Sequence, residues 1–223
     1  ELESFAYSVS HDLRAPLRAT QGYSGMLGED LGAEVTPEVQ RDLDAIAHTA
    51  RRMEAIIDDL LKLATVGQRD LKLQSVPLSE LMARVLEEMD PPQAVTVHVQ
   101  SDELGVVYVD PGLIMLALRN LLANAIKFSR TQVHPQIWIG CREVSGERVF
   151  YIRDNGVGFD PNYTSSLFGA FQRLHSEREL EGTGLGLMIV KSVIEKHRGR
   201  VWATSELGQG ATFYFVIPEP QQP

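Results

Sequence analysis

The sequence predicts an α+β protein in which a helical hairpin precedes an α/β sandwich with a mixed sheet. Residues 36–65 carry a heptad seam of apolar side chains, whereas the chain after residue 76 alternates β-rich with helical segments and holds most of the glycine. The net charge of -9 is uneven, because residues 1–66 hold twice as many acidic as basic residues. These changes predict two domains, 1–66 and 67–223, and 43% hydrophobic residues can supply a core for each.

The helix predicted for 36–65 begins where Thr36 offers an N-cap and Pro37 a first-turn proline. Its apolar positions recur at alternating spacings of four and three: Val39, Leu43, Ile46, Ala50, Met53, Ile57, Leu60 and Ala64. A second apolar stripe runs from Leu2 to Leu27, and the glycine-containing segment 28–35 separates the two. One hairpin cannot bury both stripes, so we expect two hairpins to pair as a four-helix bundle, which makes the protein a homodimer.

His11 and Asp12 lie in the first of these helices, and the helical phase places His11 on the face away from the stripe. Pro16 follows inside the helical pattern, where it removes a backbone hydrogen bond and tends to kink the helix. This combination fits a working site or an ordinary surface histidine, and the segment alone leaves both interpretations open.

The second domain alternates helices with strands from Leu78 onward. Amphipathic patterns predict helices over 78–89, 112–128 and 185–197. The β-rich segments predict strands over 95–99, 105–109, 136–143, 148–153, 200–204 and 211–217. We expect one mixed sheet with the helices on one face.

Asn120, Asn124 and Lys127 share one face of the otherwise apolar helix 112–128, at positions i, i+4 and i+7. Amide oxygens can ligate a hard cation, and a lysine suits a phosphate. The alternative is that the two asparagines are core amides with satisfied hydrogen bonds.

Two glycine-rich segments follow. Asp154 ends a strand and begins DNGVG, a turn whose carboxylate can accept a hydrogen bond from an exocyclic amine. GTGLG at 182–186 precedes a helix, where exposed backbone amides can bind phosphate. The residues between them, 159–181, show little periodicity and predict a mobile lid.

The composition of the chain bears on its cellular location and on the partners that it can bind. Cys141 is the only cysteine, so no internal disulfide is available and a cytosolic, cytoplasmic location is favoured. No apolar run approaches the roughly 18 residues that span a bilayer. The charge of -9 argues against binding to nucleic acid or direct contact with an anionic membrane.

Together and in this order, the motifs resemble those of the sensor histidine kinases of two-component signalling, over essentially the whole chain. SHDLRAP is similar to the phosphoacceptor box, NLLANAIKFS to the asparagine box, and LFGAFQR to the phenylalanine box. DNGVG, GTGLGL and GQGATF resemble the first, second and third glycine boxes of the family. The opening FAYSVSHDLRAPLR is also similar to versions found in phytochrome-like and other PAS-linked kinases.

The resemblance implies a dimerisation and phosphotransfer hairpin followed by a Bergerat-type domain that binds ATP with Mg²⁺. It implies that His11 attacks the γ-phosphate, that Asp12 acts as general base or orienting group, and that phosphate then passes to the receiver domain of a response regulator. Asn124 would hold the metal, Asn120 and Lys127 would assist, and Asp154 would bind the adenine amine. The resemblance places the following further residues around ATP: Phe128, Gly156, Gly158, Gly182, Thr183, Gly184, Leu185 and Gly186. Phe168 and Phe171 would anchor the lid.

Two positions bear on competing functions. Related ATPases carry a glutamate where Asn120 stands, and an asparagine cannot take a proton from water, so transfer to His11 is favoured over hydrolysis. Many kinases of the family have Thr or Asn four residues after the histidine, to position water for dephosphorylating the regulator. Ala15 occupies that position, so we expect weak phosphatase activity. A nucleotide-binding scaffold without kinase activity is the remaining alternative.

Overall fold

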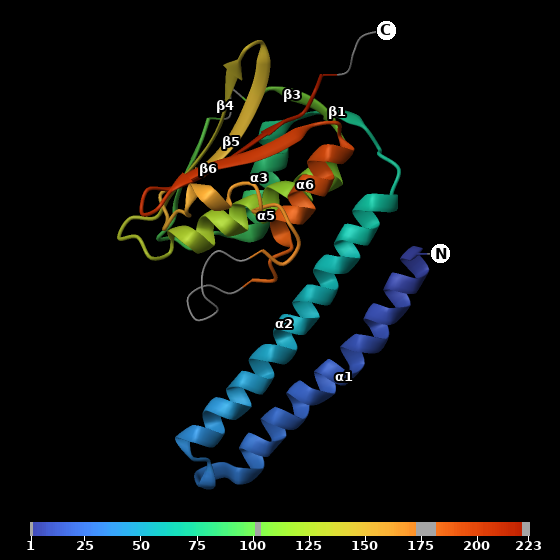
Figure 1. Ribbon diagram of the computed structural model, residues 1–223, viewed down its shortest axis with the longest axis vertical. Helices are drawn as coiled ribbons and strands as arrows, with labels where there is room; N and C mark the ends of the chain where they lie inside the picture. Colours follow the sequence, from blue (N-terminus) through green and yellow to red (C-terminus); the bar gives the residue numbers. More distant parts are fainter. Residues whose placement is uncertain (1, 101–103, 173–181, 220–223) are drawn as a thin grey trace. The chain divides into compact units, whose positions relative to one another are not determined.

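The computed structural model describes residues 2–100, 104–172 and 182–219, without the side chains of residues 2–11 and Ala33. The chain divides into two compact units, Glu1–Gln68 and Arg69–Pro223, and each is described by itself (Figure 1). Within the described ranges, no helix has the length and apolar character needed to cross a bilayer.

The first unit is the predicted helical hairpin (Figure 1). Helix α1 (Leu2–Leu31) and helix α2 (Pro37–Gln68) flank the short 3-10 helix η1 (Gly32–Glu34). The predicted connection 28–35 began too early, because α1 continues through Gly28 to Leu31. Thr36 caps α2 as expected, since its Oγ1 accepts a hydrogen bond from the Val39 amide at 3.3 Å. Pro16 lies inside α1, and the helix continues past it without a break.

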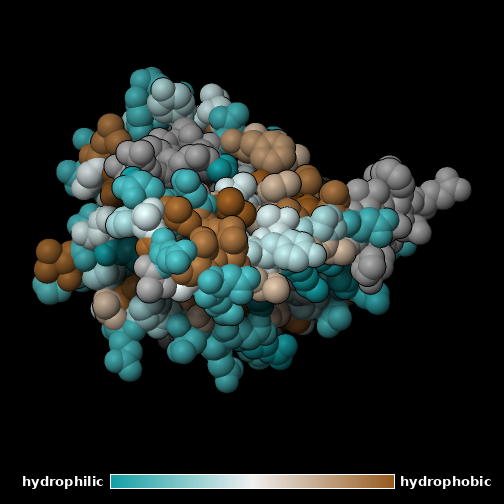
Figure 2. Space-filling model, turned by 90° about the horizontal axis from the view of Figure 1, so that it is seen from below, coloured by the Kyte–Doolittle hydropathy of each residue, from teal (hydrophilic) through white to brown (hydrophobic). Residues whose placement is uncertain are grey.

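The heptad seam of α2 divides into two rows. Leu43, Ala50 and Ile57 are buried in the isolated hairpin. Ile46, Met53 and Leu60 alternate with them and are 45%, 49% and 46% exposed. Leu13, Tyr23 and Leu27 of the α1 stripe are likewise exposed. Figure 2 shows brown apolar side chains among teal polar ones on the face seen from below. The hairpin thus buries one row and leaves the other uncovered.

The second unit contains a five-stranded mixed sheet with its helices on one face (Figure 1). The strand order is β2-β4-β5-β7-β6, in which β2 and β4 are parallel and the other neighbours antiparallel. Its strands are β2 (Thr96–Val99), β4 (Gln136–Val144), β5 (Glu147–Asp154), β6 (Arg200–Glu206) and β7 (Gly210–Val216). The helices are α3 (Leu78–Met89), α5 (Pro111–Ser129) and α6 (Gly186–Lys196).

The expectation of a single sheet was wrong for the strand near residue 107. Strand β3 (Val106–Val109) pairs antiparallel with β1 (Gln74–Pro77) in a separate two-stranded sheet. β1 was not predicted, because its four residues QSVP contain one β-branched side chain and end in a proline.

Alternation along the strands gives the large sheet two different faces. Ile137, Ile139 and Ile152 point to the inner face and are buried with the apolar side of α5 and α6. Trp138 and Arg153, one residue along their strands, occupy the outer face. Because the helices cover only the inner face, the outer face is left without a covering layer of helices.

Candidate functional site

Helix α5 presents a polar stripe within a buried element. Asp110 caps its start, because Oδ1 accepts the Leu113 amide at 3.2 Å, and Pro111 follows at the first helical position. Asn120 and Asn124 are half-buried among leucines. The Asn120 side-chain amide donates to the Leu116 carbonyl at 2.8 Å.

Asn124 lies one turn beyond Asn120. Its side chain makes no hydrogen bond with any residue that the structure describes. A half-buried amide without such a partner fits a ligand position better than a satisfied core amide.

Asp154 ends strand β5 and is almost fully buried. Its Oδ1 accepts the Gly156 amide at 2.8 Å and the Ala211 amide at 3.4 Å, so both bonds use one oxygen. Burial raises the pKa of Asp154 to about 6, although the two amides and the nearby Arg153 oppose the shift. A buried carboxylate with one oxygen held by the backbone can present the other oxygen to a donor group.

The DNGVG turn lies against the carboxyl-terminal end of α5. A Cβ on Gly156 would overlap the Phe128 carbonyl, which also accepts the Val157 amide at 3.2 Å. At Gly158, φ is +64° and a Cβ would overlap the Glu206 carbonyl. Close backbone approach therefore requires glycine at these two positions.

The GTGLG segment lies against the polar stripe of α5. A Cβ on Gly186 would lie 2.8 Å from Asn120 Oδ1, and one on Gly182 would lie 3.1 Å from Lys127 Nζ. Helix α6 begins here, and no side chain of a described residue caps its first amides. A lysine beside an uncapped helix start is an arrangement that binds phosphate.

The other residues of this segment support the turn. The Thr183 hydroxyl accepts the Leu185 amide at 3.2 Å, and the Leu185 side chain is buried. Gly184 has φ of +77°, and a Cβ on it would lie 3.0 Å from the Cα of Phe171. The glycine at 184 therefore satisfies both a left-handed backbone and a close approach.

The first part of the predicted lid has local structure. Phe159 is buried and tilted against Phe213 at 6.5 Å, and a 3-10 turn, η2 (Pro161–Tyr163), follows. Phe168 is half-buried, whereas Phe171 is mostly exposed with φ of +57°. Residues 173–181, the rest of the expected lid, lie outside the described residues.

His11 and Asp12 lie on α1 in the other unit. The expected outward orientation of the His11 side chain lies outside the described residues. Asp12 is exposed, and Arg14 two positions later binds Asp58 of α2, with Nη2 and Oδ1 2.5 Å apart. Sequence reasoning missed this ion pair, and the complementary charges at facing positions of the hairpin were the available signal.

A buried polar network near the start of the second unit was also missed. Asp110 accepts the Lys72 amide at 3.0 Å and lies 3.4 Å from the Arg69 guanidinium. His197 Nε2 accepts the Asp110 amide at 3.0 Å, so its Nδ1 donates to the Val193 carbonyl. Burial opposes ionisation, but the backbone amides and Arg69 hold the pKa of Asp110 below its usual value.

The structure thus brings one group of predicted residues together: the asparagine stripe, Lys127 and Phe128 on α5, Asp154, and both glycine segments. His11 and Asp12 lie on α1, in the other unit of the chain. Sequence reasoning recognised GQGATF as a motif but did not assign site residues in it. Gly210 has φ of +85° and no room for a Cβ beside the Asp154 carbonyl, and the next amide donates to Asp154.

Both units of the chain are similar to known proteins. Residues 109–221 match the family of histidine kinase-, DNA gyrase B-, and HSP90-like ATPases, and residues 1–69 match the His Kinase A (phospho-acceptor) domain. The chain is 37% identical to cyanobacterial phytochrome A of Nostoc sp. over 98% of its own length and 28% of that protein. It is 36% identical to the methanogenesis regulatory histidine kinase FilI of Methanothrix harundinacea, over 99% of its own length and 25% of that protein.

Among solved structures, full-length ShkA in complex with AMPPNP superposes with a TM-score of 0.67 at 27% identity, over 96% of this chain and 45% of ShkA. The chain therefore matches only a part of each of these longer proteins. Both of its units, with their motifs in family order, are accounted for by one family. The chain belongs to the histidine kinases, and it comprises their phospho-acceptor domain and their ATPase domain.

Proposed function

We propose that this chain uses ATP to phosphorylate His11 and then passes the phosphoryl group to an aspartate in the receiver domain of a response regulator. The observation that carries the proposal is the cluster around α5, where Asp154, Asn124 and Lys127 lie beside the uncapped start of α6. That cluster offers a recognition group for a base at one end and groups for phosphates at the other.

Asp154 selects the base. One of its oxygens is occupied by the Gly156 and Ala211 amides, and the other accepts the exocyclic amine of adenine. Only glycine fits at position 156 beside this carboxylate, because a Cβ there would overlap the Phe128 carbonyl and lie 2.8 Å from Asp154 Oδ1.

The phosphates lie toward Lys127 and the first amides of α6 in this proposal. The ammonium group and the helix N-terminus both favour negative charge, which an acidic chain of net charge -9 otherwise repels. Gly182 and Gly186 keep the loop backbone close to the α5 stripe.

Asn124 is the residue we assign to Mg²⁺, with Asn120 beside it. The fit rests on chemistry that the structure offers, namely a half-buried amide oxygen with no hydrogen bond to the described residues. When bound, the ion neutralises charge on the phosphate oxygens during transfer.

In the transfer step, an imidazole nitrogen of His11 forms a bond to the γ-phosphorus while the bond from that phosphorus to the bridging oxygen breaks and ADP leaves. Asp12 orients the imidazole or takes its proton. A carboxylate oxygen of the regulator's aspartate then attacks the phosphohistidine, and the nitrogen–phosphorus bond breaks.

Homodimerisation follows in this proposal from the uncovered row of the seam. Ile46, Met53 and Leu60 repeat at heptad spacing and are half-exposed in a single hairpin. A second copy of the same hairpin offers the same row, which suits a symmetric four-helix bundle. The cysteine-poor composition and the use of ATP favour a cytoplasmic site of action.

Two competing functions are less well supported. A hydrolytic ATPase needs a base for water, and the Asn120 amide instead donates to the Leu116 carbonyl. A scaffold without catalysis would not need His11, Asn124 and Asp154 to occur together. The lack of a hydroxyl or amide at Ala15 supports only weak phosphatase activity toward the regulator.

The test is incubation of the chain with Mg²⁺ and γ-labelled ATP, comparing the wild type with His11→Gln. We expect label on the protein that is lost in acid, retained in alkali and absent from the variant. Steady release of inorganic phosphate without labelled protein would instead establish a hydrolytic ATPase.

A further inference from the structure

The outer face of the five-stranded sheet, opposite the helices, contains a groove of about 740 Å³. It is lined by outward side chains of β4, β5 and β7 together with His98 and Gln100. This volume lies within the range of small-molecule sites. The groove is separate from the α5 cluster, because Asp154 points inward and its neighbour Arg153 points outward on the same strand.

Gly140 allows two side chains of the groove lining to lie against β4. It lies on the outer face of β4, paired with Tyr151 of β5. A side chain here would overlap Gln100 Oε1 and lie 2.6 Å from the Tyr151 hydroxyl, which donates to that same oxygen at 2.7 Å. Gly140 thus makes room for the Gln100 and Tyr151 side chains, whose hydrogen bond forms part of the groove lining.

Two stacks of planar side chains border the depression. His98 stacks on Trp138 with ring centroids 5.7 Å apart, and the guanidinium of Arg153 lies 5.3 Å from the Trp138 centroid. In the second stack, Arg142 lies 5.0 Å from the centroid of Tyr214, which stacks on Trp202. Each stack therefore includes an arginine that lines the groove.

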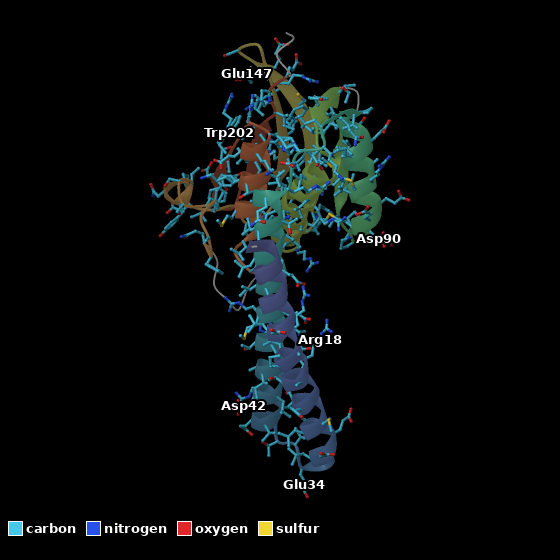
Figure 3. All side chains as sticks on the ribbon, turned by 90° about the vertical axis from the view of Figure 1, so that its right-hand side faces the viewer. Arg18, Glu34, Asp42, Asp90, Glu147 and Trp202 are labelled. Atoms are coloured by element: carbon cyan, nitrogen blue, oxygen red, sulfur yellow. The ribbon has the colours of Figure 1, made fainter. Side chains whose placement is uncertain are left out.

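Neither arginine forms an ion pair with a described residue, although Arg153 acts electrostatically on Asp154 across the strand. Arg142 and Arg153 make cation-π contacts, and no Asp or Glu is among the described residues that line the groove. Arg200 differs, because it also covers a ring of this face, that of Trp202, but donates to Glu147 at 3.0 Å. Figure 3 labels Trp202 and Glu147 in this unit. The groove is a local positive site on a chain of net charge -9.

We propose that this groove is a second nucleotide site, which binds a planar aromatic anion of the mononucleotide class. Planar guanidinium groups and indole or phenol rings stack on a base. Arg142 and Arg153, which form no ion pair with a described residue, supply charge-assisted hydrogen bonds to a phosphate. A volume of about 740 Å³ suits a small molecule as the occupant. The proposal does not depend on the kinase activity of the α5 cluster.

Intrinsic fluorescence can test the proposal directly. Trp138 and Trp202 are the only tryptophans of the chain, and both lie on this face. The probe is guanosine 5′-monophosphate, because guanine carries a carbonyl where adenine offers the amine assigned to Asp154. We expect saturable quenching that persists in Trp202→Phe, where Trp138 alone reports, and in Asp154→Asn, where the α5 cluster is altered.

Matched variants locate the binding. Loss of a charge-assisted bond in Arg142→Ala or Arg153→Ala should weaken affinity about tenfold. Arg200→Ala removes an arginine from the same face that is already paired with Glu147, so affinity should stay within about twofold. Arg153→Lys should recover only part of the affinity, because it restores the charge but not the planar stack.

Three results would overturn the proposal. One is the absence of saturable quenching by the nucleotide when a poly-glutamate peptide does quench, which would make the groove a protein-docking surface. Another is quenching by inorganic phosphate or ribose 5-phosphate with equal affinity, which would remove the role of the base. The third is loss of the signal in Asp154→Asn, which would place the binding at the α5 cluster.

Discussion

The helical hairpin and the α/β unit differ in how completely each covers its own apolar surface. In the α/β unit, the apolar side chains of α5 and α6 and the inner face of the sheet are almost fully buried. In the hairpin, Leu43, Ala50 and Ile57 are buried, whereas the alternate residues of the same seam stay half-exposed. One unit thus carries a complete core, whereas the other leaves a row of apolar side chains uncovered.

The largest effect should come from placing charge in the uncovered row. Met53→Asp together with Leu60→Asp would bury two carboxylates from each chain in the proposed four-helix bundle, and should weaken dimerisation by at least about a hundredfold. Light scattering during size-exclusion chromatography measures the mass. Thr49→Asp, at an exposed polar position of the same helix, is the control and should leave the dimer intact. A dimer that survives the double substitution would show that the seam is not the interface.

The α/β unit should instead be most sensitive at its close backbone contacts. Gly156→Ala would push a Cβ into the Phe128 carbonyl and should lower the free energy of unfolding by about 2–4 kcal/mol, with loss of ATP binding. Gly146→Ala is the control, because φ there is +81° but no atom lies within 4 Å. It should cost only about 1 kcal/mol, the penalty for the left-handed backbone. Thermal unfolding and nucleotide titration measure both effects, and equal losses in the two variants would argue against the close approach.

The hydrogen-bond network at Asp110 holds the first residues of the α/β unit against the core of that same unit. Asp110→Ala removes the cap of α5 and the acceptor for the Lys72 amide, and should cost about 2–3 kcal/mol. Asp160→Ala, which removes an exposed cap on a 3-10 turn, should cost about 0.5 kcal/mol. Hydrogen exchange of the Lys72 amide should accelerate in the first variant alone. Unchanged protection of that amide would contradict the assigned role.

Substitution of Asp154 should raise the free energy of unfolding, whereas the preceding substitutions lower it, because burial of this carboxylate costs stability. Its pKa rises from 3.8 to about 6 in the folded chain, so the folded state binds more protons between these values. The free energy of unfolding therefore falls as pH rises through this window and levels off above it. Asp154→Asn should remove that dependence and stabilise the ATP-free chain by about 1–2 kcal/mol at pH 8. Chemical denaturation at pH 4, 6 and 8 tests this, and a less stable variant at pH 8 would refute it.

The smallest expected change is on the hairpin surface, where Ala15 is exposed. Ala15→Thr supplies a hydroxyl that can position water, and should raise the rate of dephosphorylation of a partner regulator severalfold without altering the dimer. Ala15→Ser is a matched hydroxyl variant, and Ala15→Val is the β-branched control. Decay of labelled regulator with ADP present measures the effect. Strong phosphatase activity in the unchanged protein would contradict the expectation from Ala15.

Sequence periodicity predicted the helices of both units well, because each buries a stripe that repeats at 3–4 residues. It missed β1, whose four residues are held by pairing with β3 and have little strand preference of their own. The glycine motifs predicted the backbone of the site, since close approach leaves no choice of residue at Gly156 or Gly158. The Asp110 network and the outer groove were not predicted, because each depends on contacts between residues distant in sequence, such as Asp110 with His197.

The most direct test of the account compares His11→Gln with Asp154→Asn, measuring bound ATP and protein-bound label in the same sample. The expected result is that both variants lose acid-labile label, but that His11→Gln still binds ATP while Asp154→Asn does not. Label that persists on His11→Gln with the same acid lability would show that another residue accepts the phosphate, and would contradict the account.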